Sequence, residues 1–365
     1  MKARVNQLRQ LLTEHDLDVL VISNPLNYRY LSGFTGSAGA LCITADVQYL
    51  IVDSRYYTQA EQQAPDWQMV KSQHGWIVGV QEWVKEHQAK RVGFEADHLT
   101  YKEWHKFANA SPEGTTWVPF SDVVVKMRSV KANHEYEGIR AAQVLTDLAG
   151  ERLPLMIQVG MTEKQVAWEL EKFLRENGAD ALAFETIVAS GPNSALPHHR
   201  PANRVIQDNE PVTIDFGAKL NGWHSDMTRT FFTGKPTLEY RRVYETVLGA
   251  VDVVERDLKA GTALRAADSL ARDYIVEFGY GDYFGHGLGH GVGLAIHEEP
   301  HLSFRAEEKD ITYSGQIVTI EPGIYIPDWG GVRIEDLAMV TPDGVEILSQ
   351  TTKDIDTWRK ARQSN

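Results

Sequence analysis

The sequence predicts an α/β unit at the N-terminus followed by a larger α+β unit. In the first third of the chain, short apolar runs alternate with helical patterns, which is typical of an α/β arrangement. Across residues 123–133 this pattern gives way to a long helical stretch, and strand-like segments follow it among further helices. A chain of 365 residues is also long enough for two cores. We therefore expect two domains, at residues 1–126 and 127–365.

The expected N-terminal domain begins with a helix at about residues 5–15. Three short apolar runs follow at residues 18–22, 39–44 and 47–53, and turn-forming sequences such as SNP and TAD separate them. Residues 80–87 have helical periodicity, and residues 91–95 are typical of a strand. Helices and strands that alternate in this order predict an α/β domain.

The expected C-terminal domain opens with a helix at residues 135–156. Thr162 and Gln165 fit a capping box, and the helix that follows them should end near Gly178. Two more helices are expected at about residues 238–258 and 264–278. The segments between and after these helices are strand-like, which predicts an α+β domain.

Composition argues against several classes of partner. The formal net charge of -13 disfavours binding to nucleic acid or to anionic membranes. No stretch approaches 18 uncharged apolar residues, and the first 20 residues mix charged with apolar side chains, so we expect neither a membrane span nor a signal peptide. Cys42 is the single cysteine, which excludes an internal disulfide and is typical of a reducing cytoplasm.

Four carboxylates and one imidazole form a candidate set of metal ligands: Asp215, Asp226, His290, Glu321 and Glu335. One nitrogen with several carboxylates is a hard, oxygen-rich set that suits Mn²⁺, Co²⁺, Zn²⁺ or Fe²⁺. Four converging carboxylates would repel one another without cations, and carboxylates that bridge two ions about 3.5 to 4 Å apart are usual in aminopeptidases. We therefore expect two divalent ions, with Mn²⁺ as the first choice.

The two aspartates lie in the arms of a predicted hairpin. The Asn-Gly pair at 221–222 is a strong turn signal, and a turn there places Asp226 opposite Gly217 and Asp215 opposite Thr228. Both carboxylates then project to the same side, roughly 7 to 8 Å apart at the backbone. Two ions fit between them, and Gly217 adds room because it has no side chain. The alternative is a pair of strand-end aspartates on an exposed hairpin.

The two glutamates occur in apolar strand-like segments. Glu321 ends QIVTIE, and Glu335 lies within VRIEDLAMV. A carboxylate among apolar residues is costly unless it is paired or bound to metal. The alternative is a buried ion pair with Arg333 or Arg229. Arg333 precedes Glu335 by two residues on the same strand face, so it can instead orient a ligand carboxylate.

Three histidines, His286, His290 and His297, occur near one another in a glycine-rich segment. Residues 297–301 match the zinc-protease pattern HExxH, which requires a helix, but Pro300 and the preceding glycines make a helix improbable. Phosphate binding by these glycines is also disfavoured, because no GK[ST] follows them. Three histidines beside four carboxylates favour a functional site over isolated surface or core histidines.

These five contexts, in this order, resemble the pita-bread metallopeptidases, which include methionine aminopeptidase, prolidase and aminopeptidase P. The N-terminal third is similar to the creatinase-type domain of prolidase and aminopeptidase P, and the segments SGFTGSAGA and VDSRYYTQA are similar to bacterial aminopeptidase P. The resemblance covers the whole chain. It implies an α/β creatinase-like N-terminal domain and an α+β pita-bread catalytic domain.

The resemblance also implies a role for each matching residue. Asp215, Asp226, His290, Glu321 and Glu335 match the metal ligands. Four further positions match residues of the active site. His198 matches a histidine that contacts the substrate, and His297 matches one that stabilises the tetrahedral intermediate. His286 matches a further active-site histidine, and Arg333 matches an arginine beside the ligands. Tyr325 resembles another residue beside the ligands and is a candidate for substrate binding. His199 and Arg200 follow His198 and are expected to affect specificity.

The function implied is removal of the residue that precedes proline at a peptide N-terminus, as in aminopeptidase P. A hydroxide that bridges the ions would attack the scissile carbonyl, Glu321 would act as general base and then general acid, and His297 would stabilise the oxyanion. The alternative within the class is a prolidase that accepts only dipeptides. Two remoter alternatives are a non-catalytic peptide-binding module of the same fold and a metal-free creatinase-type enzyme. Members of this family complete their sites with a neighbouring subunit, which implies a homodimer or larger assembly.

Overall fold

The computed structural model describes residues 2–363. The chain divides into two compact units, the first ending at Arg128 and the second beginning at Ser129. Each unit contains its own hydrophobic core. Among the described residues, no helix is both long enough and apolar enough to cross a membrane.

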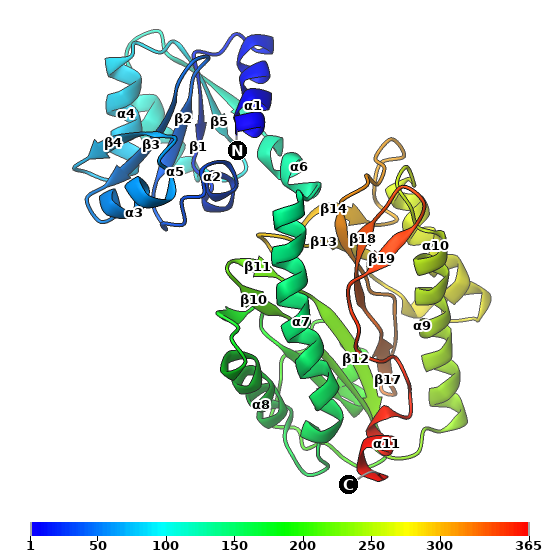
Figure 1. The fold of residues 1–365 in the computed structure, drawn as a ribbon. Helices are drawn as coiled ribbons and strands as arrows, with labels where there is room; N and C mark the ends of the chain where they lie inside the picture. The colour runs from blue at the N-terminus through cyan, green and yellow to red at the C-terminus, as the bar shows by residue number, and fades with distance from the viewer. Residues whose placement is uncertain (1, 364–365) are drawn as a thin grey trace. The chain divides into compact units, whose positions relative to one another are not determined.

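The N-terminal unit is an α/β structure, as the sequence predicts (Figure 1). Its six strands form one sheet in the order β4-β3-β2-β1-β5-β6, with β1 at Val19–Ile22, β2 at Ala40–Ile43, β3 at Gln48–Asp53, β4 at Gln68–Ser72, β5 at Arg91–Glu95 and β6 at Thr116–Phe120. Its helices are α1 at Lys2–Glu14, α2 at Pro25–Ser32, α3 at Tyr57–Gln63, α4 at Trp76–Glu86, α5 at Tyr101–Ala110 and α6 at Val123–Ser129.

The strands that sequence patterns identified are the inner ones. β1, β2, β3 and β5 are largely buried, so apolar residues occupy most of their positions: all of β1 and β2 and the centres of β3 and β5. The two strands that were not predicted, β4 and β6, are the edges of the sheet. Both are partly exposed, and β6 contains Pro119, which is tolerated at an edge. Their mixed composition gave no clear strand signal.

The C-terminal unit has helices on two flanks of its strands (Figure 1). On one flank lie α7 at Asn133–Met156 and α8 at Glu163–Glu176, and on the other lie α9 at Leu238–Asp257 and α10 at Leu264–Glu277. α11 at Thr357–Gln363 packs beside α7, where the indole of Trp358 donates to the Ile157 carbonyl. Two short 3-10 turns occur at Gly191–Ala195 and Gly281–Tyr283. The predicted helices of this domain are confirmed to within two residues at each end.

Short sheets occupy the space between these flanks. One sheet pairs β12, β9 and β8, a second pairs β11, β10 and β7, a third has the order β14-β13-β15-β18-β19, and β16 pairs with β17. These strands are β7 at Ala181–Leu182, β8 at Ile187–Ser190, β9 at Pro211–Phe216, β10 at Ala218–Leu220, β11 at Trp223–His224, β12 at Met227–Phe232, β13 at Gly289–Gly291, β14 at Glu298–Leu302, β15 at Ile317–Ile320, β16 at Gly323–Ile326, β17 at Gly330–Arg333, β18 at Asp336–Val340 and β19 at Val345–Ile347.

The predicted hairpin has the predicted register. Leu220 pairs with Trp223 across the turn, and Asp215 pairs with Thr228. The two turn residues have positive φ angles, 49° at Asn221 and 78° at Gly222, as this type of two-residue turn requires. The register places every second side chain of β9 on the same face, which fixes the direction of the Asp215 carboxylate.

Gly217 is required for a different reason from the one expected. A Cβ atom there would lie 1.9 Å from the Ser225 carbonyl oxygen, so the close approach of two backbone segments excludes any side chain. Gly217 thus allows the two arms of the hairpin to pack closely, and its role is not to leave space for ions.

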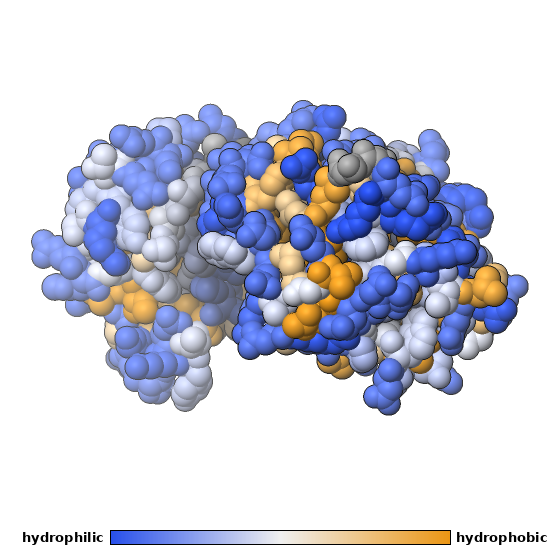
Figure 2. All heavy atoms as spheres, turned by 90° about the horizontal axis from the view of Figure 1, so that it is seen from below, coloured by the Kyte–Doolittle hydropathy of each residue, from blue (hydrophilic) through white to orange (hydrophobic). Residues whose placement is uncertain are grey.

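Hydrophilic side chains cover most of the face seen in Figure 2, with smaller hydrophobic patches among them. Apolar side chains are concentrated inside, in one cluster between α9, α10 and the neighbouring strands and another between α7, α8 and β9. The strands therefore have cores on both sides, and the polar side chains at their ends need specific partners.

Candidate metal centre

The five predicted ligands come from strands that are distant in sequence and meet at one cavity. Asp215 belongs to β9, Asp226 immediately precedes β12, and His290 belongs to β13. Glu321 immediately follows β15, and Glu335 lies between β17 and β18. All five line a single cavity of about 420 Å³. The structure therefore brings together the whole set that the sequence singled out.

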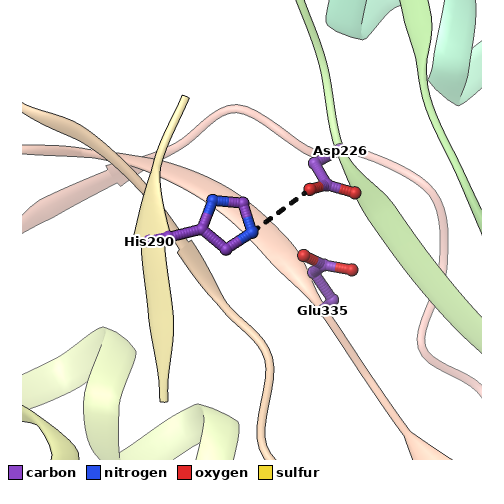
Figure 3. Close-up of side chains that lie close together, drawn as sticks. All are labelled: Asp226, His290 and Glu335. Carbon is purple, nitrogen blue, oxygen red and sulfur yellow. Dashed lines mark ion pairs between the residues drawn. The ribbon is translucent and has the colours of Figure 1, made fainter. Parts of the chain in front are cut away.

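Three of these residues form a compact group (Figure 3). Asp226, His290 and Glu335 each offer one ligand atom, and these atoms lie within 4.8 Å of one another. The His290 Nε2 atom is 3.6 Å from Asp226 Oδ2 and 3.6 Å from Glu321 Oε1. These separations are too long for good hydrogen bonds, whereas two ligands of one divalent ion lie roughly 3 to 3.5 Å apart. The spacing therefore suits atoms that share a cation.

The orientation of His290 also suits a ligand. Its Nδ1 atom lies 3.1 Å from the Gly291 carbonyl, so this nitrogen carries the proton and Nε2 presents its lone pair to the carboxylates. Burial, and then the neighbouring His297, lower the pKa of His290 to about 3. The imidazole is thus neutral near pH 7, which is the form that binds metal.

Asp215 has one partnered oxygen and one unpartnered oxygen. Its Oδ2 atom accepts a hydrogen bond of 2.8 Å from Arg333. Its Oδ1 atom is buried and has no hydrogen-bond partner within the described part of the chain. A buried carboxylate oxygen without a partner is costly, and a divalent cation beside it would remove that cost.

The electrostatics of the cluster favour cations as well. Burial raises the pKa of Asp226 well above its usual value, and repulsion from Glu335 and Asp215 raises it further. Burial also raises the pKa of Glu335, with repulsion from Glu321 and Asp215 adding to the effect. For Glu321, burial dominates and raises the pKa to about 8. Burial and mutual repulsion thus favour the protonated form of these groups, whereas divalent ions favour their ionised form. The residues present fit a centre of divalent metal ions.

Arg333 organises one side of the cavity. Besides Asp215, it donates to the Tyr325 hydroxyl at 2.9 Å and to the Thr228 hydroxyl at 3.0 Å. Thr228 in turn donates to Glu335 Oε2 at 2.6 Å. The guanidinium therefore orients two candidate ligands, one directly and one through a hydroxyl.

The other buried arginine has a different partner. Arg229 makes an ion pair of 2.7 Å with Asp336 and donates to the Glu335 carbonyl. The ion pairs proposed as an alternative for the two glutamates are thus formed by aspartates instead, Asp336 with Arg229 and Asp215 with Arg333. This leaves the carboxylates of Glu321 and Glu335 facing the cavity.

The remaining predicted histidines lie around the ligands. His198, His286 and His297 all line the cavity, and the His297 ring lies 4.3 Å from the His290 ring between centroids. His286 Nε2 is 2.9 Å from the Tyr325 hydroxyl. Burial lowers the pKa of His286 to about 4, and burial also lowers the pKa of His297. Burial therefore favours the neutral form of His286 and His297 near pH 7.

The HExxH segment is not helical. His297 directly precedes β14, which spans Glu298–Leu302, so His297 and His301 are not one turn of a helix apart. The prediction that Pro300 and the glycines prevent a helix is confirmed. His301 nevertheless lines the cavity, which the sequence did not predict.

Several contributors to the site were missed from the sequence. Thr228 supports Glu335, and Thr319 donates to Glu321 Oε1 at 3.3 Å and accepts from the His290 backbone. Thr228 could have been found, because the hairpin register places it opposite Asp215. The apolar wall of Phe184, Ile187 and Leu302 carries no such signal, since ordinary core positions have the same composition.

Comparison with known families and structures gives matches to both units. The family model for "Metallopeptidase family M24" matches residues 137–342, and the model for the "Creatinase/Prolidase N-terminal domain" matches residues 4–130. A solved structure entitled "Xaa-Pro dipeptidase from Bacillus anthracis" is 40% identical, with a TM-score of 0.93 and coverage of 97% of this chain and 99% of that chain.

Two other solved structures are similar in their full length. Prolidase from Pyrococcus furiosus is 36% identical, with a TM-score of 0.88 and coverage of 94% of this chain and 99% of that chain. An X-Pro aminopeptidase from Thermotoga maritima is 35% identical, with a TM-score of 0.86 and coverage of 93% and 97%. These similarities confirm a creatinase-type N-terminal domain and a pita-bread C-terminal domain.

Proposed function

Because this chain belongs to metallopeptidase family M24, we propose that it is a two-metal exopeptidase that hydrolyses the bond between any residue and a following proline. The observation that carries the proposal is the convergence of four carboxylates and His290 on one cavity, where a buried oxygen of Asp215 has no hydrogen-bond partner among residues 2–363. Without cations, the mutual repulsion and burial of these carboxylates would only destabilise the fold.

We propose that five residues hold the ions: Asp215, Asp226, His290, Glu321 and Glu335. When bound, the ions supply Lewis acidity that lowers the pKa of water and polarises the scissile carbonyl. Glu321 takes the proton of the attacking water and returns it to the leaving nitrogen. Its position at the cavity wall, next to His290, supports this role.

The histidines act on the substrate in this proposal. A neutral His297 donates its N–H to the oxyanion that develops on the carbonyl, and His198 contacts the bound peptide. Support comes from their place in the cavity wall and from the burial that keeps His297 neutral. Tyr325 and Arg333 act through contacts with their neighbours, because Tyr325 bridges His286 and Arg333 and the guanidinium holds Asp215.

We propose dipeptides as the preferred substrates. The sequence alone favours an aminopeptidase P activity on longer peptides, whereas similar proteins named Xaa-Pro dipeptidase or prolidase favour the alternative. Aminopeptidase P remains the second candidate because of the similar X-Pro aminopeptidase from Thermotoga maritima. Release of the first amino acid should be measured from an Xaa-Pro dipeptide and from the matching Xaa-Pro-Xaa tripeptide. Faster cleavage of the tripeptide would replace the first candidate by the second.

The native metal, assembly and location are further parts of the proposal. We propose Mn²⁺ as the native ion, a homodimer as the assembly and the cytoplasm as the location. The oxygen-rich ligand set supports Mn²⁺, and the single buried thiol, Cys42, supports a reducing compartment. Elemental analysis of the purified protein, with activity measured before and after addition of Mn²⁺, tests the metal. Light scattering tests the assembly.

A further inference from the structure

One buried carboxylate outside the cavity has no part in the chemistry above. Glu163 is the first residue of α8 and follows the N-cap residue Thr162. Its side chain has no exposed surface. A buried carboxylate is costly unless hydrogen bonds compensate for the lost water, so its partners indicate its purpose.

Five donors surround this carboxylate. Its Oε1 atom accepts from the Ser190 backbone N–H at 2.8 Å, from the Ser190 hydroxyl at 2.7 Å and from the Asn193 side chain at 2.9 Å. Its Oε2 atom accepts from His199 Nε2 at 2.8 Å and from the Ala202 backbone N–H at 2.9 Å. Burial opposes ionisation, but the hydrogen bonds, led by that from His199, outweigh it and lower the pKa of Glu163. The group is therefore a charged acceptor with its capacity filled.

The donors lie on both sides of His198 in the chain. Residues 190–202 form the His198 segment, in which Ser190 and Asn193 precede His198 while His199 and Ala202 follow it. The middle of this segment faces the cavity, because His198 and Pro197 line it. One carboxylate thus fixes both ends of the segment that carries His198.

The His198 segment is also connected to the ligand side of the cavity. The Pro197 carbonyl accepts from Arg333 at 3.3 Å, and the Gly331 N–H donates to the Ser194 hydroxyl at 2.8 Å. Arg333 also donates to Asp215, so one guanidinium contacts both the His198 segment and a candidate ligand. The hydrogen bonds to Glu163, here called the anchor, therefore hold the His198 segment in place and fix the position of His198 in the cavity wall.

We propose that Glu163 is a positioning residue that sets the substrate affinity of the site by holding His198 in the cavity. This inference rests on the proposed function, in which His198 contacts the peptide. It also assigns a purpose to His199. The His199 ring is directed to Glu163, so its effect on substrate preference is exerted through the anchor.

The Glu163→Gln variant tests the anchor. Glutamine has nearly the same shape, but it loses the charge and directs an amide N–H₂ group at donors. We expect KM for an Xaa-Pro dipeptide to rise about tenfold, which corresponds to the loss of one good charged hydrogen bond. We expect kcat to change less than about threefold and the metal content to stay the same. Unchanged KM would overturn the proposal.

Two further comparisons separate positioning from general stability. In a His198→Ala background, Glu163→Gln should raise KM no further, because the imidazole that the anchor positions is already absent. His199→Gln keeps a donor and should stay near wild type, whereas His199→Phe removes it and should raise KM. Additive effects in the His198→Ala background would contradict the proposal.

Thr162→Ala is the matched control. It removes the cap of the same helix, where the Thr162 hydroxyl accepts from the Gln165 N–H, but it leaves the carboxylate in place. We expect a lower melting temperature with unchanged KM. If Thr162→Ala raised KM as much as Glu163→Gln does, the rise in KM would result from a less stable N-terminus of α8 rather than from loss of the carboxylate, and the proposal would fail.

Hydrogen exchange distinguishes failure of the anchor from failure of the proposed function. In Glu163→Gln, amides of the His198 segment should exchange faster, while those of α9 should not change. If the His198 segment exchanges faster in Glu163→Gln but the wild type cleaves no Xaa-Pro peptide, the anchor proposal is supported and the proposed substrate is refuted. Equal exchange in the variant and the wild type would refute the anchor, whatever the substrate.

Discussion

Arg333 and Asp215 form a largely buried ion pair of 2.8 Å at the edge of the cavity, and the second oxygen of Asp215 has no hydrogen-bond partner in the described part of the chain. One oxygen is thus held in place while the other faces the site. The guanidinium holds its acceptors in fixed directions, which a lysine ammonium cannot reproduce.

Arg333→Lys should weaken both metal binding and catalysis. A single ammonium group cannot reach Asp215, Tyr325 and Thr228 together, so the ligand carboxylates lose their orientation. We expect affinity for Mn²⁺ and kcat/KM to fall about 10- to 100-fold, the usual effect of losing a partner of a metal ligand. Calorimetric titration with Mn²⁺ measures the first. Arg256→Lys, at an exposed arginine paired with Asp257, is the control and should have no effect.

Glu321→Gln should abolish turnover in a folded protein. The amide cannot take a proton from water, and loss of general acid-base catalysis typically costs 10² to 10⁴ in rate. Circular dichroism should match the wild type, because Glu321 lines the cavity and is not a member of either hydrophobic cluster of this unit. Glu346→Gln, at an exposed carboxylate that accepts from Tyr136, should keep full activity. Retention of more than a tenth of the wild-type rate would contradict the role of Glu321.

Asp226→Asn should have opposite effects on stability with and without metal. Burial and repulsion from Glu335 raise the pKa of Asp226, so above the unfolded pKa of about 3.9 the unfolded chain releases this proton more readily than the metal-free fold does. The metal-free fold therefore loses stability as pH rises. The variant should therefore melt at a higher temperature than wild type in a chelator at pH 7. With Mn²⁺, the wild type should gain stability and the variant should gain less. A variant less stable than wild type in the chelator would argue against the repulsion.

The metal-free protein should lose stability in acid through His286. Burial lowers the pKa of His286 to about 4, whereas an unfolded histidine has a pKa of about 6.5. Between these values the unfolded chain binds more protons, so the contribution of His286 is complete above pH 6.5, decreases as pH falls from 6.5 to 4 and is lost below pH 4. From pH 7 to pH 5 this group should account for about 2 kcal/mol of lost stability.

The comparison that isolates His286 uses urea unfolding of His286→Gln at both pH values. The variant should lose about 2 kcal/mol less than wild type over this range. His134→Gln, at an exposed histidine, should lose as much as wild type. An identical loss in His286→Gln and wild type would show that burial does not hold this imidazole neutral.

Gly217→Ala should disrupt the hairpin that carries both aspartates. The added Cβ would lie 1.9 Å from the Ser225 carbonyl oxygen, so the backbone must shift. We expect a loss of about 1 to 3 kcal/mol in stability and weaker Mn²⁺ binding, since Asp226 follows Ser225 directly. Gly344→Ala, where no atom lies within 4 Å of the added Cβ, is the control. Unaltered Mn²⁺ affinity in Gly217→Ala would show that the ligands do not depend on this contact.

The sequence singles out the five candidate ligands, which line one cavity, because their chemistry conflicts with their surroundings. Asp215 and Glu321 are carboxylates in or beside buried strands, and such conflicts are visible without a structure. Hairpin register follows from the turn at 221–222 by counting. The residues that support the ligands are harder to identify. Thr319 and His301 resemble ordinary strand residues. Only the pairing of strands brings Thr319 to the His290 backbone and His301 to the cavity.

The edge strands and the Glu163 anchor show the same limit. β4 and β6 lack the apolar runs of buried strands, so local composition does not distinguish them from loops. Glu163 occupies the first turn of a helix, where acidic residues are common for reasons unrelated to catalysis. Its five donors come from a segment that begins 27 residues later, and no local pattern predicts that contact.

The distribution of the donors over so many strands has a consequence for biosynthesis. Asp215 emerges from the ribosome long before Glu335, and an ion that meets the early donors alone finds too few of them to displace its hydration shell. If these residues hold the ions as proposed, ion capture is a late event that follows completion of the chain, and cells short of the ion would accumulate folded, inactive apoprotein that can be activated afterwards.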